Sequence, residues 1–182
     1  MAEAANVRER RLARPGARRH RIALIDGPNM SNLGRRSKKV YGPIRSLEEL
    51  HTFVREAGAA LGVEVETFAS NYEGALLEYI HASAERVDGY IVNPAGLTTQ
   101  SEAMRHALEE TDKPVVEVHF ANLHAAGTSP RGVPAGPIVS RFSPTATGVV
   151  MGLRHYSYLG ALVALVWSLD DADFLGAGLG GG

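Results

Sequence analysis

Apolar positions along the chain follow two spacings, one typical of buried strands and the other of amphipathic helices. Short apolar or alternating runs bounded by turn residues predict five strands, at residues 22–25, 63–68, 89–92, 114–118 and 147–151. Apolar residues between them recur every three or four positions and predict four main helices, at 47–61, from 71 or 73 to 84, from 99 to 108, and at 156–169. Ser46 and Thr99, each followed by Glu three residues later, are the predicted caps of two helices.

Strands and helices alternate along the chain with short connections. Such βαβ repeats produce a parallel sheet covered by helices on both faces. The pattern predicts an α/β fold, a flavodoxin-like three-layer sandwich with a five-stranded parallel sheet of order 2-1-3-4-5. Ligands of such sheets bind beyond the carboxyl ends of the strands, at the switch point between strands 1 and 3. The polar residues expected there are Asp26, Asn29, Asn93, Glu117 and His119.

The segment after the first strand, residues 30–42, shows no clear period and predicts a long loop. Long structureless loops in compact domains are usually functional or disordered. No acid lies between Asp26 and Glu48, and the segment ends at Tyr41 and Gly42. The cations in and just after it are Arg35, Arg36, Lys38, Lys39 and Arg45. An active-site lid over an anionic substrate and a solvated basic loop both fit this stretch taken alone.

Composition limits the domain organisation and the classes of partner. The 182 residues predict one domain at 21–170, a disordered Arg-rich extension at 1–20 and a flexible Gly-rich tail at 171–182. A net charge of −1 argues against a nucleic-acid partner. The longest apolar run, 159–167, is far too short to cross a membrane. The sequence contains no cysteine, which excludes thiolate chemistry and fits a cytoplasmic protein.

Nucleotide binding and metal binding are both poorly supported. The turn at 26–29 has one glycine and a proline, and the chain contains no phosphate-binding glycine motif. The histidines are scattered, and His51 and His81 are expected to face water from their helices. Glu117 and His119 flank one strand residue and point to the same face, although His119 alone also fits a satisfied core histidine. We expect neither a metal nor another cofactor.

General acid–base chemistry fits these strand-end residues better. His119, steadied by Glu117 or by Asn93, is a suitable proton donor. Tyr41 is a suitable base if a cation stabilises its phenolate, and Arg36 is close enough in sequence to do so. The turn after the first strand would hold a water or an oxyanion. These groups together suit a reaction in which a proton next to a carbonyl is removed and a hydroxyl is then lost, without a cofactor.

Four motifs in this order resemble those of the type II 3-dehydroquinate dehydratases. They are GPNMSNLGRR at 27–36, followed by Tyr41 and Gly42, then SNYEG at 70–74, NPAGLT at 93–98 and EVHFANLHA at 117–125. The match runs from about residue 21 to 169. The resemblance implies a flavodoxin-like fold, a dodecamer built of trimers, and anti elimination of water through an enolate. The implied roles are Tyr41 as base, Arg36 as its activator, Asn29 as holder of the water, His119 with Asn93 as acid, and Glu117 as the residue that orients His119.

Several positions depart from the family's pattern. Asp26 replaces an asparagine of the first turn. The other changes fall on family contacts to the substrate: Thr99 stands for a histidine, Ala121 for a serine and His106 for an aspartate, and the arginine pair after residue 125 is missing. Only Arg131 or Arg141 is available to replace that pair, while the backbone of Phe120 and Ala121 keeps two N–H groups for an anion.

Three hypotheses follow for a small anionic cyclic substrate. The first is an ordinary dehydratase that converts 3-dehydroquinate to 3-dehydroshikimate in the shikimate pathway of aromatic amino acid biosynthesis, or in quinate metabolism. The second is a dehydratase on the same scaffold acting on a different cyclic hydroxy-ketone in specialised metabolism. The third is a non-catalytic oligomeric binding homologue. Joint presence of Arg36, Tyr41 and His119 argues against the third, because packing does not require them.

Overall fold

The computed structural model describes residues 12–14, 16–125, 127–128, 134–135 and 138–171. Its main sheet is parallel, with strand order β2-β1-β3-β4-β7. The strands are β1 (Arg21–Asp26), β2 (Glu64–Ala69), β3 (Gly89–Asn93), β4 (Val115–His119) and β7 (Gly148–Met151). The predicted order is confirmed, since β7 is the fifth predicted strand. The short strands β5 (Gly127–Thr128) and β6 (Pro134–Ala135) pair with each other between β4 and β7 in the chain.

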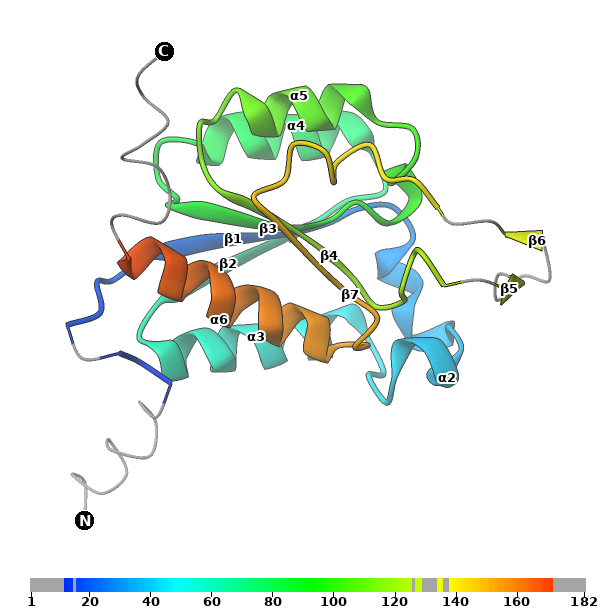
Figure 1. Cartoon of the computed structure of the whole chain (residues 1–182), viewed down its shortest axis with the longest axis horizontal. Coiled ribbons are helices and arrows are strands. Elements are labelled where there is room, and N and C mark those ends of the chain that lie inside the picture. Colours follow the sequence, from blue (N-terminus) through cyan, green and yellow to red (C-terminus); the bar gives the residue numbers. More distant parts are fainter. Residues whose placement is uncertain (1–11, 15, 126, 129–133, 136–137, 172–182) are drawn as a thin grey trace.

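Helices cover both faces of the sheet, as predicted for a three-layer sandwich (Figure 1). One layer holds α3 (Leu47–Leu61) and α6 (Tyr156–Asp170), and the other holds α4 (Glu73–Ser83) and α5 (Glu102–Glu109). Successive residues of β1 serve the two layers in turn: Ile22 and Leu24 belong to the core under α3 and α6, whereas Ala23 and Ile25 belong to the core under α4 and α5. Every residue of β3 and β4 is buried, as expected for central parallel strands.

The helix starts agree with the sequence in one case and differ in another. Ser46 caps α3, because its hydroxyl accepts a hydrogen bond from the Glu49 N–H at 3.0 Å. The prediction that Thr99 caps the next helix is wrong: Ser101 is the cap of α5 and accepts from the Met104 N–H at 3.0 Å. The cause is η2 (Ala95–Leu97), a short 3₁₀ helix whose turn continues to Gln100.

The lid, residues 30–42, is also more regular than predicted. It contains the 3₁₀ helix η1 (Met30–Arg35) and the four-residue helix α2 (Lys38–Tyr41). The expectation of a structureless loop is therefore wrong. Two buried side chains, Met30 and Leu33, fix η1 to the core, and two residues are too few to produce a readable period. The lid lies at the end of the sheet where β5 and β6 also lie (Figure 1).

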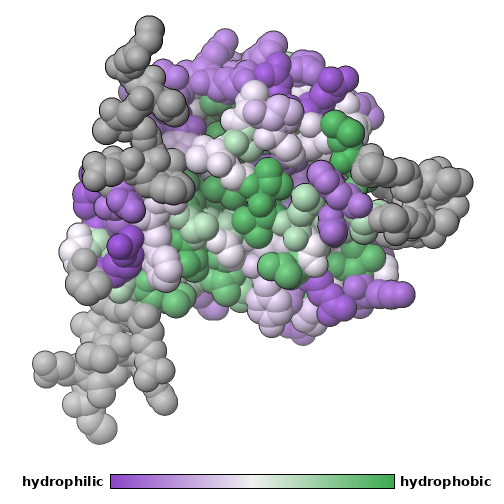
Figure 2. Space-filling view, in the orientation of Figure 1, coloured by the Kyte–Doolittle hydropathy of each residue, from purple (hydrophilic) through white to green (hydrophobic). Residues whose placement is uncertain are grey.

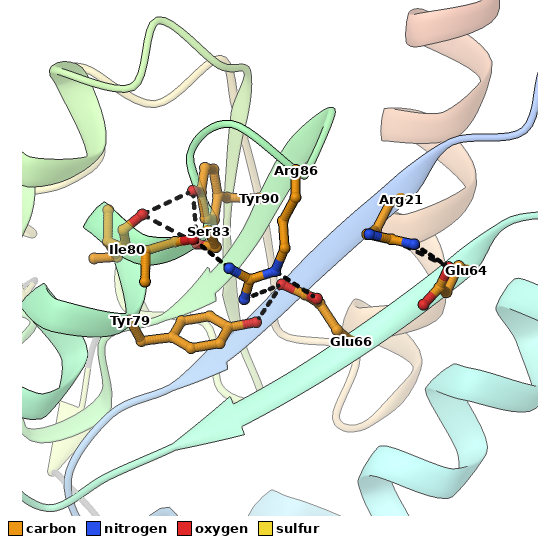
Figure 3. Close-up of polar contacts among 9 residues, drawn as sticks. Arg21, Glu64, Glu66, Tyr79, Ile80, Ser83, Arg86 and Tyr90 are labelled. Carbon is orange, nitrogen blue, oxygen red and sulfur yellow. Dashed lines mark hydrogen bonds and ion pairs between the residues drawn. The ribbon is translucent and has the colours of Figure 1, made fainter.

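A polar network joins α4 to the edge strand β2 (Figure 3). Glu66 accepts a hydrogen bond from the Tyr79 hydroxyl at 2.7 Å and pairs with Arg86 at 3.0 Å. Burial and then the Glu66 carboxylate raise the pKa of Tyr79, so its hydroxyl stays a donor. Next to it, the Ser83 and Tyr90 hydroxyls lie 2.9 Å apart. The network holds α4 against the sheet at a distance from the lid.

The described part of the N-terminal segment contacts the end of α6. The Trp167 indole donates to the Leu12 carbonyl at 3.2 Å, and His20 Nε2 lies 2.9 Å from an Asp170 carboxylate oxygen. The predicted boundaries at residues 20 and 170 stay a prediction, and residues 1–11 and 172–182 lie outside the described chain. Among the helices that the structure describes, none is both long and apolar enough to span a membrane.

Apolar side chains remain exposed around β7 and the start of α6. Val149 lies on β7, and Leu153 and Tyr156 follow it, with Leu153 and Tyr156 more than half exposed, at 59% and 57%. Figure 2 shows hydrophobic residues gathered near the middle of the same face on which β7 and α6 lie in Figure 1. β7 is also the edge strand of the sheet, with a partner on one side only.

Candidate active site

A cavity of about 520 Å³ opens at the carboxyl ends of β1, β3 and β4. This is the place that the switch-point rule predicts. Five of the six predicted catalytic residues line it: Asn29, Arg36, Tyr41, Asn93 and His119. They come from the first turn, the lid, and the ends of two central strands, so residues far apart in the sequence meet in one cavity. The reading of residues 30–42 as a solvated surface loop is thereby disfavoured.

The lid brings Arg36 and Tyr41 together. The guanidinium carbon of Arg36 lies 4.7 Å from the centroid of the Tyr41 ring, within the range of a cation–π contact. The Tyr41 ring also packs against Phe120, with ring centroids 5.3 Å apart. Phe120 directly follows the strand end that carries His119, so the lid rests on the wall of the cavity. The predicted proximity of cation and phenol is present.

His119 and Glu117 form the second pair. His119 Nε2 lies 2.6 Å from a carboxylate oxygen of Glu117, whose side chain is fully buried. Ser140 donates to the same carboxylate at 2.5 Å, and Ser143 donates to its other oxygen. Burial opposes ionisation of Glu117, but these three hydrogen bonds outweigh it and hold the pKa of the carboxyl below its ordinary value. An ionised Glu117 requires a proton on Nε2, which leaves Nδ1 as the other nitrogen of a ring that lines the cavity.

Asn29 is held in an uncommon backbone conformation. Its φ is +74°, in the left-handed region that asparagine tolerates better than most residues. Asn71 stabilises the turn by accepting from the Asn29 N–H at 2.8 Å and donating to the Ser31 hydroxyl at 3.2 Å. The SNYEG motif at 70–74 therefore supports the first turn from outside the cavity. Gly27 permits the close approach of the neighbouring turn, because a Cβ there would lie 2.3 Å from the Pro94 carbonyl oxygen.

Asn93 belongs to a buried network centred on Asp26. Its amide nitrogen donates to Asp26 at 3.1 Å and to the Tyr158 hydroxyl at 2.7 Å, and its oxygen accepts from the Ala95 N–H at 3.1 Å. Tyr158 in turn donates to Asp26 at 2.7 Å. Burial and then Asp26 raise the pKa of Tyr158 well above its ordinary value, so it remains a donor. The Asn93 amide is thus occupied by protein groups, although Asn93 lines the cavity.

The fourth member of this network corrects a prediction. His51, expected to face water, is only 6% exposed, and its Nε2 lies 2.9 Å from the Asp26 carboxylate. The sequence contained the signal, since His51 lies four residues after Leu47 and three before Val54, on the apolar stripe of α3. His81 is exposed as predicted. Tyr158 and the two serines at Glu117 were missed, and no motif marks them.

The predicted recognition residues divide into two groups. Thr99, Phe120 and Ala121 line the cavity. His106 does not: it lies on the exposed side of α5, where its Nε2 is 2.6 Å from an Arg105 nitrogen. Arg141 is also outside the cavity, exposed and 3.5 Å from Glu102. Arg131 lies outside the described residues, so its suggested role stays a prediction.

Within the described residues, no group of three or more histidines and carboxylates is placed to hold a metal ion. On the lid, the Tyr41 phenol lies beside the Arg36 cation. At the end of β4, the His119 imidazole lies beside the Glu117 carboxylate. These are the parts of an acid–base site at the switch point of a flavodoxin-like α/β protein.

Comparison with known proteins identifies the family. The family model described as dehydroquinase class II matches residues 20–166, and the chain belongs to this family. A 3-dehydroquinate dehydratase of Halothermothrix orenii is 39% identical over 147 residues, which cover 81% of this chain and 94% of that protein. A catabolic 3-dehydroquinase of Penicillium rubens is 39% identical over 152 residues, covering 84% and 93%. The crystal structure of a type II dehydroquinase from Butyrivibrio crossotus superposes with a TM-score of 0.72 at 30% identity, covering 81% and 97%.

Proposed function

We propose that this protein is a hydro-lyase that removes water from 3-dehydroquinate to give 3-dehydroshikimate. The single observation that supports this most strongly is the meeting of Arg36 and Tyr41 on the lid with the Glu117–His119 pair in one cavity. Packing alone does not require these four groups together. The names of the relatives, which are 3-dehydroquinate dehydratases at up to 39% identity, support the same substrate.

The proposed reaction begins at Tyr41. Its phenolate takes a proton from the carbon next to the ketone, while the Arg36 guanidinium lies over the ring and faces the charge. The electron pair of the broken C–H bond passes to the ketone oxygen and forms an enolate. Asn29 holds a water that donates a hydrogen bond to this oxygen. Such a donor aimed at developing charge lowers the barrier without moving during the reaction.

His119 completes the elimination. Protonated on both nitrogens, it gives a proton to the hydroxyl that leaves from the β-carbon, as the enolate collapses to a conjugated enone and water departs. Glu117 keeps the Nε2 proton and orients the ring, which presents Nδ1 for this transfer. The Asn93 amide nitrogen donates to Asp26 and Tyr158, and its oxygen accepts from Ala95. Because these protein groups occupy the amide, its geometry supports a positioning role more than direct contact with the leaving group.

A second candidate substrate is favoured by one observation. Arg141, one of two candidates to replace the missing arginine pair, lies outside the cavity, and the wall near the lid is made of Val40, Leu123 and Ile138. Arg131, the other candidate, lies outside the described residues. Among the residues that the structure describes, this apolar wall holds no arginine that replaces the pair, which suits a cyclic hydroxy-ketone with a different substituent from 3-dehydroquinate. The acid–base steps would be unchanged, because Tyr41 and His119 act on the hydroxy-ketone unit common to both.

One assay tests the function directly. Purified protein is incubated with 3-dehydroquinate, and the conjugated enone is followed by its ultraviolet absorbance. Turnover with a kcat of about 1–10³ s⁻¹, the usual enzyme range, supports the dehydratase. Absence of turnover with 3-dehydroquinate, together with turnover of another cyclic β-hydroxy-ketone, would favour the second candidate. Absence of both would favour the non-catalytic homologue.

The proposal extends to assembly and location. We infer a homododecamer built of trimers, working in the cytoplasm on a step of the shikimate pathway. The exposed apolar residues Val149, Leu153 and Tyr156 around the edge strand β7 support self-association, because such patches are uncommon on monomers. Light scattering should give a particle larger than a trimer. A monomer at micromolar concentration would count against this assembly.

A further inference from the structure

The lid ends at a residue that only glycine can occupy. Gly42, the C-cap of α2, has φ +78° and ψ −165°, a backbone region essentially restricted to glycine. The space beside it is filled as well: a Cβ on Gly42 would lie 2.9 Å from His155 Nδ1 and 3.5 Å from Cε1 of the same ring. The residue that follows the proposed base therefore lies close beside the Nδ1 and Cε1 atoms of an imidazole.

The His155 ring is held firmly beneath this contact. It is 6% exposed and packs edge-on against Phe53, with centroids 5.4 Å apart, and against Tyr156 at 4.0 Å. Its Nδ1 is buried and has no hydrogen-bond partner among the described residues. Burial, and next the Arg154 guanidinium, hold the pKa of His155 below its ordinary value, so the ring is neutral. A buried polar atom without a partner costs stability, which makes plain core packing a poor reason for a histidine here.

A second close approach fixes the first half of the lid against the chain that follows it. A Cβ on Gly34 would lie 2.1 Å from the Arg45 carbonyl oxygen, so the chain entering the lid touches the chain leaving it. Lys38 Nζ donates to the Ile44 carbonyl at 2.5 Å and ties α2 to the same exit. The stretch between these two close approaches carries Arg36 and Tyr41. Their mutual position depends on where the stretch is seated.

We propose that His155 is a positioning residue that acts through Gly42 on Tyr41. The imidazole supports the end of the lid, because it packs beside Gly42 and favours the backbone conformation found there. In this way it sets the direction in which the preceding Tyr41 ring enters the cavity. This inference rests on the proposed function only where Tyr41 is called the base. The support of the lid by His155 follows from the geometry of Gly42 and His155 alone.

A double-mutant cycle tests the coupling in the full-length protein. Gly42→Ala should lower kcat about 10²-fold with KM changed less than threefold, because small misplacements of a reacting group cost about this much. His155→Ala should lower kcat about tenfold, and His155→Phe, which keeps a ring, should restore most of that loss. The loss in the double variant should be smaller than the product of the single losses, since the clash needs both groups.

A control at Gly62 measures the effect of an added Cβ that meets no neighbour. Gly62, the C-cap of α3, has φ +80° and ψ 19°, in the left-handed helical region, and a Cβ there meets nothing within 4 Å. The double-mutant cycle separates the clash from backbone strain, because the strain of Gly42→Ala is the same with histidine or alanine at position 155. Gly62→Ala should leave kcat and KM unchanged. If Gly62→Ala and Gly42→Ala reduce kcat equally, or if the losses in the cycle simply multiply, the proposal is wrong.

Trypsin provides a readout that needs no activity. Arg35, Lys38 and Lys39 are exposed on the lid, so brief digestion reports how firmly the lid is seated. Cleavage there should accelerate several-fold in Gly42→Ala and His155→Ala, but not in His155→Phe or Gly62→Ala. An unchanged cleavage rate in Gly42→Ala and His155→Ala would show that His155 does not hold the lid in place. A wild-type protein without dehydratase turnover would refute the proposed function instead, and the digestion would still decide between a seated and an unseated lid.

Discussion

The guanidinium of Arg36 lies over the face of the Tyr41 ring, with its central carbon 4.7 Å from the ring centroid. Both residues belong to the lid, one after η1 and the other at the end of α2. The positive charge and the phenol are therefore carried by one short segment. Their pairing is set by local chain geometry, independently of the strand residues that line the other side of the cavity.

Tyr41→Phe should abolish turnover and preserve the fold. The phenylalanine ring retains the packing against Phe120 and loses only the ionisable hydroxyl, so the free energy of unfolding should change by less than about 0.5 kcal/mol. Tyr72→Phe is the matched control, since Tyr72 is 79% exposed and should be removable without effect on kcat. Steady-state kinetics and denaturant unfolding measure the two quantities. Near-native turnover in Tyr41→Phe would show that another group is the base.

His119→Ala should lower kcat by about 10²–10⁴, the usual loss for a general acid. The control is His124→Ala, an exposed histidine five residues further along the same segment. KM should change little, because the rest of the substrate is bound by groups other than His119. A loss in His119→Ala no larger than in His124→Ala would exclude His119 as the acid.

Ser143→Ala should destabilise the protein in a pH-dependent manner. The folded-state pKa of Glu117 lies below its unfolded value, so its contribution to stability is present at neutral pH and is lost as the pH falls through the folded-state pKa. Removing one donor should cost about 1.5–3 kcal/mol at pH 7. The difference from wild type should shrink in acid, where the carboxyl is protonated in both proteins. Urea unfolding at several pH values measures it, and a difference that grows in acid would contradict this account.

His51→Leu should strongly destabilise the fold. It removes the partner of one oxygen of the fully buried Asp26 carboxylate, whose other oxygen accepts from Asn93 and Tyr158, and breaking a buried pair typically costs about 3–5 kcal/mol. His81→Leu, an exposed histidine on α4, should change stability by less than about 0.5 kcal/mol. Asp26→Asn in the His51→Leu background should recover part of the loss by removing the unpaired charge. Equal effects of the two histidine changes in thermal unfolding at constant protein concentration would refute the pairing.

The sequence predicted the sheet because its strands are apolar and its helices periodic over many residues. It failed where few residues decide the structure. The lid shows no period in the sequence, because only Met30 and Leu33 anchor η1 to the core. The first cap was right at Ser46, whereas at Thr99 the preceding 3₁₀ turn displaced the start of the helix to Ser101.

The same distinction applies to the site. Strand-end residues such as His119 and Asn93 were predictable, because topology alone carries them to one edge of the sheet. Their partners were not: Ser140 and Tyr158 reach the site from segments that no local pattern links to it. The burial of His51 is predictable from its place on the apolar stripe of α3, although a lone histidine on a helix more often faces water.

The last prediction concerns the substrate. Wild-type protein should process 3-dehydroquinate with a kcat/KM below the ordinary range of about 10⁴–10⁸ M⁻¹s⁻¹. The reason is that Thr99 and Ala121 line the cavity at positions where the resemblance implies a histidine and a serine, and Arg141 lies outside it. A site that loses the partner of a substrate hydroxyl discriminates strongly against that substrate.

Thr99→His should raise kcat/KM for 3-dehydroquinate about fivefold, the value of one hydrogen bond of about 1 kcal/mol. The gain should fall mainly on KM, because the contact is remote from the reacting carbon. The resemblance implies that the family's aspartate at position 106 reaches the site of a neighbouring subunit, and His106 lies on the exposed side of α5, away from the cavity of its own chain. For that reason His106→Asp should help only in the assembled oligomer. Dilution to dissociate the oligomer should therefore cancel the effect of His106→Asp and spare that of Thr99→His. A wild-type kcat/KM within the ordinary range would refute the altered substrate and leave residues 120 and 121, through their backbone N–H groups, as sufficient anion contacts.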